Sequence, residues 1–313
     1  MADQTPCILL AGGGRDRNLK RIYDRMKQRG CRVVALIAGG RWHPQVTWVL
    51  GAQEISIDGQ NVRPQAAFIR HDVFSYLHDR RPAIAFRSDS WYSTTTSWLA
   101  CSPGVRYLNR RSLGQVLWKP YTFQRAIAAG LNIPATLVSN RVSDIRDFAS
   151  GERKVVKPVQ GGGYCRPLEK ALSAARPRHA ATAAPAIVQP QLAYPELRVY
   201  GVAGRFFGLS INSEEVDYRV STRHTVTPDV VPHDVQLGLT NLMSDLGLDL
   251  CAVDFKTDPK TGQLFVLDVN DMPMFELHDE MLEGAISDAI IDYLQGQPAS
   301  QARPEAAASD VVV

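Results

Sequence analysis

The sequence predicts an α/β protein of 313 residues whose last part is an antiparallel sheet. In the first hundred residues, short apolar runs alternate with amphipathic stretches, which is typical of a small α/β unit. From Lys154 onward strand patterns dominate, with hairpin turns at Ala203-Gly204 and at residues 258–262. One helix, predicted over residues 235–246, separates the two hairpins. A chain of this length has room for two or three small domains.

The first part of the chain is predicted to begin with a strand, a helix and a second strand. The strands are expected over residues 7–11 and 32–38, and a polar helix over residues 18–29 lies between them. Gly12-Gly13-Gly14 follows the first strand and is compatible with a dinucleotide-binding loop or with a tight turn. The run lacks Gly-x-Gly-x-x-Gly spacing and an acidic residue placed to hold a ribose, so the pattern favours the turn. We therefore do not expect a nicotinamide-dependent oxidoreductase.

A second part is predicted to begin with a helix over residues 121–129, which Gly130 ends, and a strand over residues 134–138. Residues 168–185 are rich in Ala and Arg and have few large apolar side chains, so we expect a surface excursion there. Residues 295–313 are rich in Ala, Pro, Ser and Gln without helical periodicity, which predicts a disordered tail. The predicted divisions are residues 1–108, 109–190, 191–294 and the tail at 295–313.

Composition argues against several classes of function. The formal charge is +3, from 35 basic and 32 acidic residues, which is too small to indicate a nucleic-acid partner. The five cysteines are scattered without Cys-x-x-Cys spacing, and the histidines lack ligand spacing, so a zinc site is not expected. The first residues lack a signal-peptide pattern, and no run approaches the ~18 apolar residues of a membrane span. We expect a cytoplasmic protein with reduced thiols and no membrane partner.

The last hairpin carries the most informative polar residues. Asp254 lies in the apolar run 250–256, and Asp268 and Asn270 lie in the run 264–270 after the turn. Side chains alternate along a strand, so Asp268 and Asn270 share one face, and the turn brings Asp254 roughly opposite them. Two carboxylates and an amide oxygen suit Mg²⁺, a hard cation that takes oxygen ligands. The alternative is a solvated face with incidental acids, although an acid among apolar residues is costly to bury without a partner.

A strand that ends in lysine and enters a glycine run lies at residues 154–163. The glycines at residues 161–163 let backbone N–H groups approach phosphate oxygens, and they let the loop close over a bound nucleotide. Lys157 supplies a point charge to the phosphates, and Pro158 stiffens the exit from the strand. The same segment is equally compatible with an ordinary turn that carries a surface lysine.

Two further strands carry candidate residues. Residues 186–192 form an apolar strand that becomes polar at its end, where backbone groups could pair with an adenine edge. Glu196, Arg198 and Tyr200 alternate along the next strand and share a face, either as a structural ion pair or as functional groups. Arg219 follows in Asp-Tyr-Arg, where it could neutralise a transferring phosphoryl group or an oxyanion. Aromatic residues at 91–98 indicate an acceptor cleft or packing beneath a loop.

Taken in order, these motifs resemble those of the ATP-grasp ligases over about residues 105–280. The order is a lysine before the central domain, Lys-Pro-x-x-Gly-Gly-Gly, an adenine-hinge strand, Glu-x-Arg, Asp-Tyr-Arg, a first metal-binding Asp and Asp-x-Asn. Within this superfamily the sequence is similar to RimK-like ligases and, more narrowly, to microviridin-type graspetide synthetases, which crosslink ribosomal peptides. Local matches at residues 130–136, 196–199 and 217–219 carry the narrower resemblance.

The resemblance implies a small Rossmann-like N-terminal domain, a central α/β lid domain with the glycine-rich loop, and a C-terminal antiparallel-sheet ATP-grasp domain. It also implies that the protein binds ATP and two Mg²⁺ ions. The implied ATP-binding residues are Lys119 and Lys157 for the phosphates, Gly161, Gly162 and Gly163 for the covering loop, Gln189, Gln191 and Leu192 for adenine, and Glu196 for the ribose or the polar network beside the metals. The implied metal ligands are Asp254, Asp268 and Asn270, and the implied catalytic residues at the acyl-phosphate site are Arg198 and Arg219.

The chain departs from the family pattern in three places. Asp268 stands where glutamate is common, and a shorter acid still chelates a cation with a shifted geometry. Gln189-Pro190-Gln191 stands where Gln-Glu is common, which changes the adenine contact. Phe86-Arg87-Ser88 stands where graspetide synthetases often carry Trp-Tyr-Arg-Arg, so leader-peptide recognition has the least support from the sequence.

The implied activity is ATP-dependent ligation of a carboxylate to an amine or a hydroxyl, through an acyl phosphate and with release of ADP and phosphate. The implied partner is a carboxylate-bearing ribosomal precursor peptide that receives amide or ester crosslinks. Two alternatives stay open: a RimK-like ligase of a free amino acid or small peptide, and a non-catalytic nucleotide-binding protein that keeps the fold. The sequence is compatible with a homo-oligomer.

Overall fold

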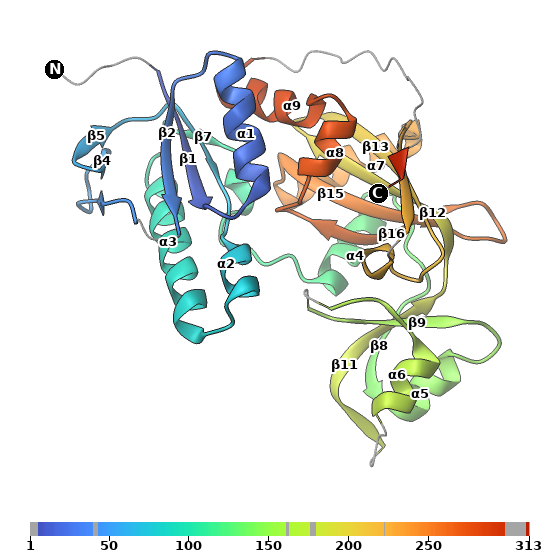
Figure 1. The fold of residues 1–313 in the computed structure, drawn as a ribbon. Coiled ribbons are helices and arrows are strands. Elements are labelled where there is room, and N and C mark those ends of the chain that lie inside the picture. The colour runs from blue at the N-terminus through green and yellow to red at the C-terminus, as the bar shows by residue number, and fades with distance from the viewer. Residues whose placement is uncertain are drawn as a thin grey trace.

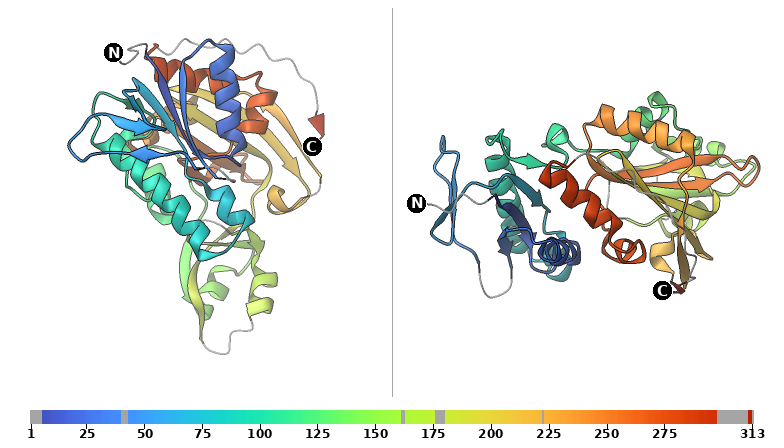
Figure 2. Two further views of the ribbon diagram at one scale, coloured as in Figure 1. Left: turned by 60° about the vertical axis from the view of Figure 1, so that its left-hand side comes forward. Right: turned by 90° about the horizontal axis from the view of Figure 1, so that it is seen from above.

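The computed structural model describes residues 6–39, 43–160, 163–175, 180–221, 223–297 and 311–312. An N-terminal domain and a C-terminal domain lie side by side, and a smaller central domain projects from the C-terminal one (Figure 1). Figure 2 shows the same arrangement from two further directions. The predicted α/β fold class is confirmed, with a parallel sheet in the N-terminal domain and antiparallel main sheets in the other two.

The N-terminal domain is built on a parallel sheet with the strand order β2-β1-β6-β7. Helix α1 packs Leu19 against Ile8 on one face, and α3 packs Trp98 against Leu9 on the other. Successive residues of β1 therefore serve two cores, as expected for a strand buried on both faces. The elements are β1 (Ile8–Gly13), α1 (Arg17–Gln28), β2 (Val33–Ala38), β6 (Ala66–Ile69), α2 (Val73–His78), α3 (Pro82–Ala100), β7 (Arg106–Tyr107), η1 (Arg110–Ser112) and a small sheet of β3 (Val46–Thr47), β4 (Ile55–Ile57) and β5 (Gln60–Val62).

Helix α3 is the longest element of this domain that the sequence does not predict. Its C-terminal half is rich in Ser and Thr, which usually favour turns because their hydroxyls compete for backbone groups. Here the hydroxyls bond back onto the helix, since Thr94 Oγ1 donates to the Ser90 carbonyl at 2.8 Å and Thr96 Oγ1 to the Tyr92 carbonyl at 2.6 Å. Trp98 is fully buried. Tertiary packing therefore overrides the local preference of this segment.

The turn after β1 is tight. A Cβ atom on Gly13 would lie 2.0 Å from Cγ of Asp72, so a larger residue does not fit there. Asp16 then caps α1 by accepting from the Asn18 N–H at 2.8 Å, and it also pairs with Arg70. Of the two interpretations of Gly12-Gly13-Gly14, these contacts support the tight turn.

The central domain is an antiparallel sheet with the strand order β10-β9-β11-β8. Helices α5 and α6 pack on this sheet, where Ile145 and Leu168 meet Val188. The predicted boundary at residue 190 falls between the last strand of this sheet and the first strand of the C-terminal sheet. The elements are α4 (Lys119–Ala128), β8 (Leu137–Arg141), α5 (Val142–Phe148), β9 (Lys154–Pro158), β10 (Arg166–Pro167), α6 (Leu168–Ala175) and β11 (Ala181–Pro190).

Two predictions for this domain need correction. The strand predicted over residues 134–138 begins at Leu137, because Thr136 turns its hydroxyl onto the Pro134 carbonyl at 2.6 Å. Most of the described residues in the surface excursion predicted over residues 168–185 are exposed, but both of its ends have regular structure, α6 and the first half of β11. Leu168 is buried, so even this Ala-rich stretch supplies an apolar contact to the sheet. Residues 176–179 lie outside those described.

The C-terminal domain is an antiparallel sheet with the strand order β16-β15-β12-β13-β14-β17. Helix α7 covers one face, where Leu239 and Leu242 pack with Val199 and Val253. The predicted helix and both predicted hairpins are confirmed. The elements are β12 (Ala193–Val202), β13 (Arg205–Ser213), η2 (Tyr218–Val220), β14 (His224–Asp229), α7 (His233–Leu246), β15 (Leu250–Thr257), β16 (Leu264–Asn270) and β17 (Val311–Val312).

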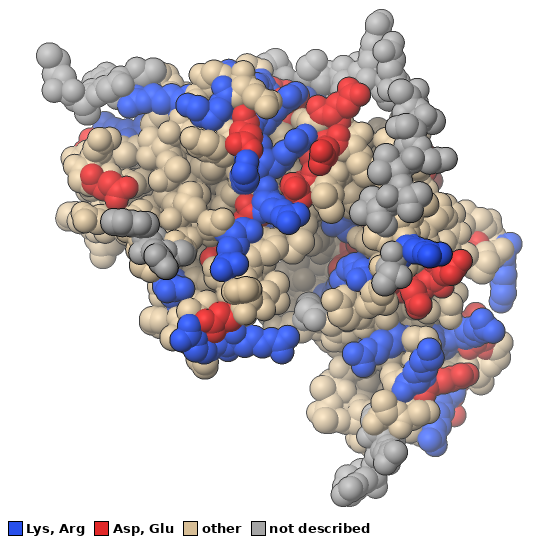
Figure 3. Space-filling view, in the orientation of Figure 1, with Lys and Arg blue, Asp and Glu red and all other residues tan. Residues whose placement is uncertain are grey.

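Two helices near the C-terminus, α8 (Glu276–Met281) and α9 (Ala285–Gln295), connect the N-terminal and C-terminal domains. Ile290 of α9 shares one core with Ile8 of β1 and Tyr200 of β12. Outside that core, arginines of α1 pair with acids of α8 and α9, as in Arg21–Asp279 at 2.8 Å. Figure 3 shows basic and acidic side chains interleaved over these helices. The N-terminal domain therefore packs directly against α8 and α9, which follow the C-terminal sheet in the sequence.

Most of the predicted tail at residues 295–313 lies outside the described residues, namely residues 298–310 and 313. Gln295 ends α9, and residues 311–312 pair with β14 as strand β17. Within the described ranges, no helix is both long and apolar enough to cross a lipid bilayer.

Asn109 fastens the end of the N-terminal domain to the C-terminal sheet. Its φ of 60° lies in the left-handed region. Its side-chain amide donates to the carbonyls of Leu250 and Asp271, each at 2.9 Å. Its Oδ1 accepts from the N–H groups of Asp249 and Leu250, at 2.7 and 2.8 Å. One side chain therefore satisfies four backbone groups of another domain.

We expect Asn109→Gly to lower the free energy of unfolding by about 2–4 kcal/mol, because glycine accepts the left-handed backbone but leaves four backbone groups without partners. Chemical denaturation measures this change. Ala203→Gly is the matched control, since Ala203 also has a positive φ, of 48°, but has no polar side chain to lose. Equal stability of Asn109→Gly and the wild type would show that these hydrogen bonds contribute nothing.

Candidate functional site

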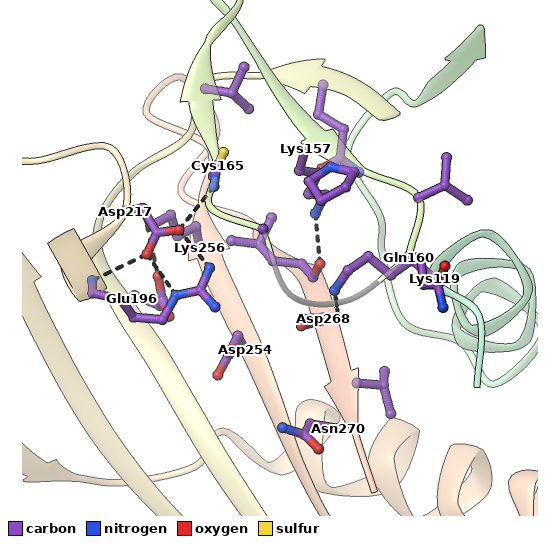
Figure 4. Close-up of a pocket in the computed structure, with 18 of the residues that line it drawn as sticks. Lys119, Lys157, Gln160, Cys165, Glu196, Asp217, Asp254, Lys256, Asp268 and Asn270 are labelled. Carbon is purple, nitrogen blue, oxygen red and sulfur yellow. Dashed lines mark hydrogen bonds and ion pairs between the residues drawn. The ribbon is translucent and has the colours of Figure 1, made fainter. Parts of the chain in front are cut away.

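A cavity of about 500 Å³ lies between the sheet of the central domain and the sheet of the C-terminal domain (Figure 4). Strand β9 and the end of β11 line it on one side, β15 and β16 on the other, and η2 and residues 115–119 complete its wall. The predicted site residues that line this cavity are Lys119, Lys157, Gly163, Gln189, Gln191, Leu192, Glu196, Arg219, Asp254, Asp268 and Asn270. Arg198 lies behind the wall, and Gly161 and Gly162 lie outside the described residues.

The hairpin of β15 and β16 places oxygen ligands at the cavity wall. Asp254 pairs directly with Asp268 across the two strands, and Asn270 pairs with Ala252, so the predicted strand pairing is confirmed. Asn270 Oδ1 accepts from the Met272 N–H at 3.0 Å, which fixes the direction of its amide. Within the described residues, no three His, Cys, Asp or Glu side chains are grouped to hold a metal. The candidate cation site therefore consists of two carboxylates and one amide oxygen.

Asp254 lies between an arginine and a second carboxylate on adjacent strands. Arg198 of β12 pairs with Asp254 in the strand register, and its Nη1 donates to Asp254 Oδ1 at 2.7 Å. Burial raises the pKa of Asp254, with the charge of Asp268 adding to the rise and that of Arg198 opposing it. A cation placed between the two carboxylates would relieve both the burial cost and their repulsion.

Arg198 is itself held from behind by a buried network. Its Nε donates to the Tyr200 hydroxyl at 2.9 Å, and Tyr200 in turn contacts His278 Nδ1 at 2.6 Å and the Met274 carbonyl at 2.7 Å. Arg198 is only 8% exposed. The guanidinium therefore has a fixed direction toward Asp254, which explains why this predicted catalytic residue does not line the cavity.

Two lysines from different elements converge on Asp268. Lys119 begins α4 and its ammonium contacts the Asp268 carboxylate, while Lys157 near the end of β9 donates to the Leu267 carbonyl at 2.7 Å. Burial lowers the pKa of Lys157 to about 8, with the charge of Asp268 opposing this and that of Lys119 adding to it. Two ammonium groups near one carboxylate give a net positive charge, which a further anion, such as a phosphate, would balance.

Glu196 belongs to the network beside Asp254. Burial raises the pKa of Glu196 to about 8, and the charge of Asp254 adds to the rise. Lys256 lies 3.6 Å from Glu196, donates to the Val216 carbonyl at 3.0 Å and sits 3.7 Å from the centre of the Tyr194 ring. Lys256 is not among the predicted site residues, although its place two residues after Asp254 on one strand puts both side chains on one face.

Asp217 links η2 to the end of the glycine-rich loop. Its carboxylate accepts from Arg219 at 2.6 and 2.8 Å and from the Cys165 N–H at 3.0 Å. Although burial raises it, these hydrogen bonds hold the pKa of Asp217 below its usual value. The Arg219 guanidinium, 5.3 Å from the centre of the Tyr164 ring, is positioned at the cavity by this acid. Asp217 is a second residue to which the sequence analysis gave no role.

The segment predicted to bind adenine also lines the cavity, with part of its hydrogen-bonding capacity already used. Gln189 is buried and its Nε2 donates to Thr136 Oγ1 at 2.8 Å. The Gln191 N–H donates to the Arg153 carbonyl at 2.9 Å. These contacts fix the segment's backbone between the two sheets. Gly163 packs against Pro158, where a Cβ atom would lie 2.7 Å from the proline Cγ.

Solved structures with the same fold are ATP-grasp ligases. The ATP-grasp ligase PsnB complexed with minimal precursor, Mg and ADP matches with a TM-score of 0.74 and 22% identity, over 94% of this chain and 99% of PsnB. The macrocyclase MdnC from Microcystis aeruginosa MRC, bound with precursor peptide MdnA, matches with a TM-score of 0.72 and 20% identity, over 93% and 100%. A Chryseobacterium gregarium RiPP-associated ATP-grasp ligase, in complex with ADP and a leader and core peptide, matches with a TM-score of 0.70 and 17% identity. This match covers 93% of this chain and 97% of the ligase. No family model and no curated relative matches the sequence.

These likenesses confirm the ATP-grasp fold that the sequence motifs predict. They extend over nearly the whole of each compared chain, so the likeness of fold is not confined to one part of this chain. The cavity described above lies between the two sheets that the motifs assign to the central and C-terminal parts of this fold.

We expect the stability of this protein to fall between pH 6.5 and pH 4 in part because of His278. Burial, together with the charges of Arg198 and His224, lowers the pKa of His278 to about 4. Between pH 4 and pH 6.5 this histidine is therefore protonated in the unfolded chain and neutral in the folded one. The stabilising contribution is complete above the unfolded pKa of about 6.5 and is lost as the pH falls toward 4, up to about 3 kcal/mol. Denaturant unfolding at pH 4.5, 5.5 and 7.5 measures it.

In His278→Gln the loss of stability toward low pH should be smaller than in the wild type, because glutamine can hydrogen-bond to the Tyr200 hydroxyl without titrating. The exposed His78→Gln is the control and should keep the wild-type profile. A His278→Gln profile parallel to that of the wild type would contradict this prediction.

Proposed function

Since this chain has the ATP-grasp fold, we propose that it is an ATP-dependent ligase that activates a carboxylate as an acyl phosphate and modifies a ribosomal precursor peptide. The observation that carries the proposal is the meeting of Lys119 and Lys157 with the Asp254–Asp268 pair in one cavity between two domains. Two cations beside a pair of acids match a phosphate-bearing ligand that arrives with a divalent metal.

The donor atoms of the cavity fit Mg²⁺. Asp254, Asp268 and Asn270 offer oxygen ligands, and Mg²⁺ is commonly held by one or two carboxylates while substrate phosphates and waters complete its shell. The raised pKa of Asp254 marks a negative charge that is incompletely compensated by the protein itself. These three residues would hold the metal, which when bound would neutralise phosphate charge.

The cavity also suits a nucleotide. Its volume of about 500 Å³ lies within the range of ligand sites. Lys119 and Lys157 would bind the phosphates from opposite sides, and the loop that includes Gly163 would cover them. Gln191 and Leu192, at the junction of the two sheets, would contact the base at the other end. We propose that Gly161, Gly162 and Gln189 also belong to this nucleotide site. Glu196 would lie beside the metal ions.

The proposed chemistry proceeds in two balanced steps. A substrate carboxylate oxygen attacks the γ-phosphorus, the bond to the β-phosphate oxygen breaks, and ADP and an acyl phosphate form. A nucleophile then attacks the acyl carbon and inorganic phosphate leaves. Arg219, positioned by Asp217, would neutralise charge on the transferring group, while Arg198 holds Asp254 in place. No nucleophilic side chain of the protein is required.

A peptide substrate is supported by the compared structures, in which PsnB, MdnC and the Chryseobacterium ligase hold precursor, leader or core peptides. The likeness to the PsnB complexes covers 92–94% of this chain and 99% of PsnB, which supports a peptide substrate for this chain as well. A ligase of free amino acids and a non-catalytic nucleotide-binding protein are the outcomes that would replace this proposal.

We expect Asp254→Asn and Asp268→Asn each to lower turnover by at least about 100-fold, because each removes charge from a cation site that acts in a water-poor cavity. Turnover is measured as ADP release, and the product by intact mass of candidate acceptors, including any acidic peptide encoded beside this gene. Loss of water from a peptide indicates a crosslink, whereas gain of a residue indicates an amino-acid ligase.

Asp258→Asn is the matched control for this pair. It lies in the turn at the far end of the same hairpin, and asparagine keeps the acceptor for the Lys260 N–H. Near-wild-type rates in folded Asp254→Asn and Asp268→Asn would refute the metal assignment. Absence of ADP release from the wild type with every peptide and amino acid would refute the ligase proposal.

A further inference from the structure

The N-terminal domain holds the segment that enters helix α8, and Figure 1 shows α1 beside this helix. Asn18, in the first turn of α1, accepts through its Oδ1 from the N–H groups of Phe275 and Glu276, at 2.7 and 2.9 Å. Phe275 occupies the N-cap position of α8 and makes no side-chain cap of its own, so Asn18 supplies the cap from another domain. Arg70, which follows β6, donates to the Pro273 carbonyl at 2.9 Å. Two side chains of the N-terminal domain therefore fix the place where α8 begins.

The residues that fix this place form a buried polar network. Asp16, Asn18 and Arg70 are 3%, 2% and 4% exposed, and Asp16 accepts from the Asn18 amide at 2.7 Å and from Arg70 at 2.5 Å. Apolar side chains could join two domains without the cost of removing polar groups from water, but their contacts are not directional. Hydrogen bonds are directional, so a network whose members satisfy one another sets the orientation of α8 as well as its contact with the N-terminal domain.

The beginning of α8 holds Tyr200 from the other side. The Tyr200 hydroxyl donates to the Met274 carbonyl at 2.7 Å, contacts His278 Nδ1 at 2.6 Å and accepts from Arg198 Nε at 2.9 Å. A hydroxyl has one proton and two acceptor sites, so with a proton on His278 Nδ1 these three contacts use its full capacity. Tyr200 is fully buried, so solvent does not replace a partner that moves away. The direction of the Arg198 guanidinium therefore depends on where α8 lies.

These contacts join into one chain of hydrogen bonds that leads from the N-terminal domain to the candidate metal site. Its last link is Arg198 Nη1, which donates to Asp254 Oδ1 at 2.7 Å and so holds one of the two oxygens of that carboxylate. Groups that hydrogen-bond a metal ligand orient it, and their loss typically weakens metal binding. Asn18 stands at the other end of this chain, in a different domain and outside the residues that line the 500 Å³ cavity.

We propose that Asn18 is a positioning residue for the metal site. By capping α8 it fixes Tyr200, and Tyr200 fixes the direction in which Arg198 holds the Asp254 carboxylate toward a bound Mg²⁺. This inference rests on the proposed function, because it takes Asp254 as a metal ligand. The affinity of the site for the metal then depends on how the N-terminal domain is docked, although none of the three proposed ligands belongs to that domain.

The test measures metal binding to the full-length protein in the presence of ADP. Mn²⁺ replaces Mg²⁺ because it takes the same oxygen ligands. The electron paramagnetic resonance signal of free Mn²⁺ reports how much is bound, and a titration of ADP without protein gives the background. The variants are Asn18→Ala, Tyr200→Phe and the two combined, and chemical denaturation shows whether each is folded. Arg29→Ala is the matched control, because Arg29 also joins α1 to the C-terminal part of the chain but pairs with Asp288 and Asp292 of α9.

We expect Asn18→Ala to weaken Mn²⁺ binding by at least about 3-fold and Tyr200→Phe by about 10-fold, because both release Arg198 from its fixed direction. Since the two residues act through one chain of contacts, adding Asn18→Ala to Tyr200→Phe should change the affinity by less than about 2-fold. Arg29→Ala should bind Mn²⁺ as the wild type does.

A second variant keeps the inference testable if Asn18→Ala does not fold. Arg70→Lys keeps a cation for Asp16 but loses the contact with the Pro273 carbonyl, and it then takes the place of Asn18→Ala in every comparison. Wild-type affinity in this variant or in Asn18→Ala, an equal loss in Arg29→Ala, or single losses that multiply in the combined variant would overturn the inference while the metal site stands. A wild type that binds no Mn²⁺ beyond the ADP background would overturn the metal assignment of the proposed function as well.

Discussion

The carboxylate of Asp254 is the constraint on which the rest of the site depends. It lies between Arg198 and Asp268 on neighbouring strands of an antiparallel sheet, at the wall of the main cavity. A charge in this position requires compensation, and Arg198 supplies part of it because Tyr200 and His278 hold its guanidinium in one direction. The part of this negative charge that Arg198 does not compensate would favour a bound cation. The sheet thus fixes both the position of the site and the positive charge of the ligand that the site favours.

The site is completed by elements that approach this sheet from elsewhere. The central domain brings Lys157, and the helix that precedes it brings Lys119, so positive charge arrives from outside the sheet that carries the acids. Asp217 joins the segment after β13 to the end of the glycine-rich loop through Arg219 and Cys165. The residues proposed to bind phosphate and those proposed to bind the metal therefore come from different sheets, so the relative position of the two sheets determines whether both sets face one cavity.

The sequence predicts those features of the site that depend on short-range periodicity. Alternation along a strand puts Glu196 and Arg198 on one face, and a single hairpin turn sets Asp254 opposite Asp268; both follow from local geometry. Helix α3 is not predicted, because its Ser and Thr residues favour turns locally. Its helical conformation depends on tertiary packing, in which Trp98 is buried against the sheet.

The packing of α8 and α9 against α1 has a consequence for the synthesis of this protein. The core that contains Ile8 and Leu10 also contains Ile286 and Ile290, which are translated only after the strands of the central sheet. A nascent chain can form the strands of its N-terminal domain early, yet one face of that sheet is covered by α1 alone until α9 leaves the ribosome. The N-terminal domain is therefore completed only after the central domain has been made. Truncation within α9 would be expected to damage the N-terminal domain as much as the C-terminal one.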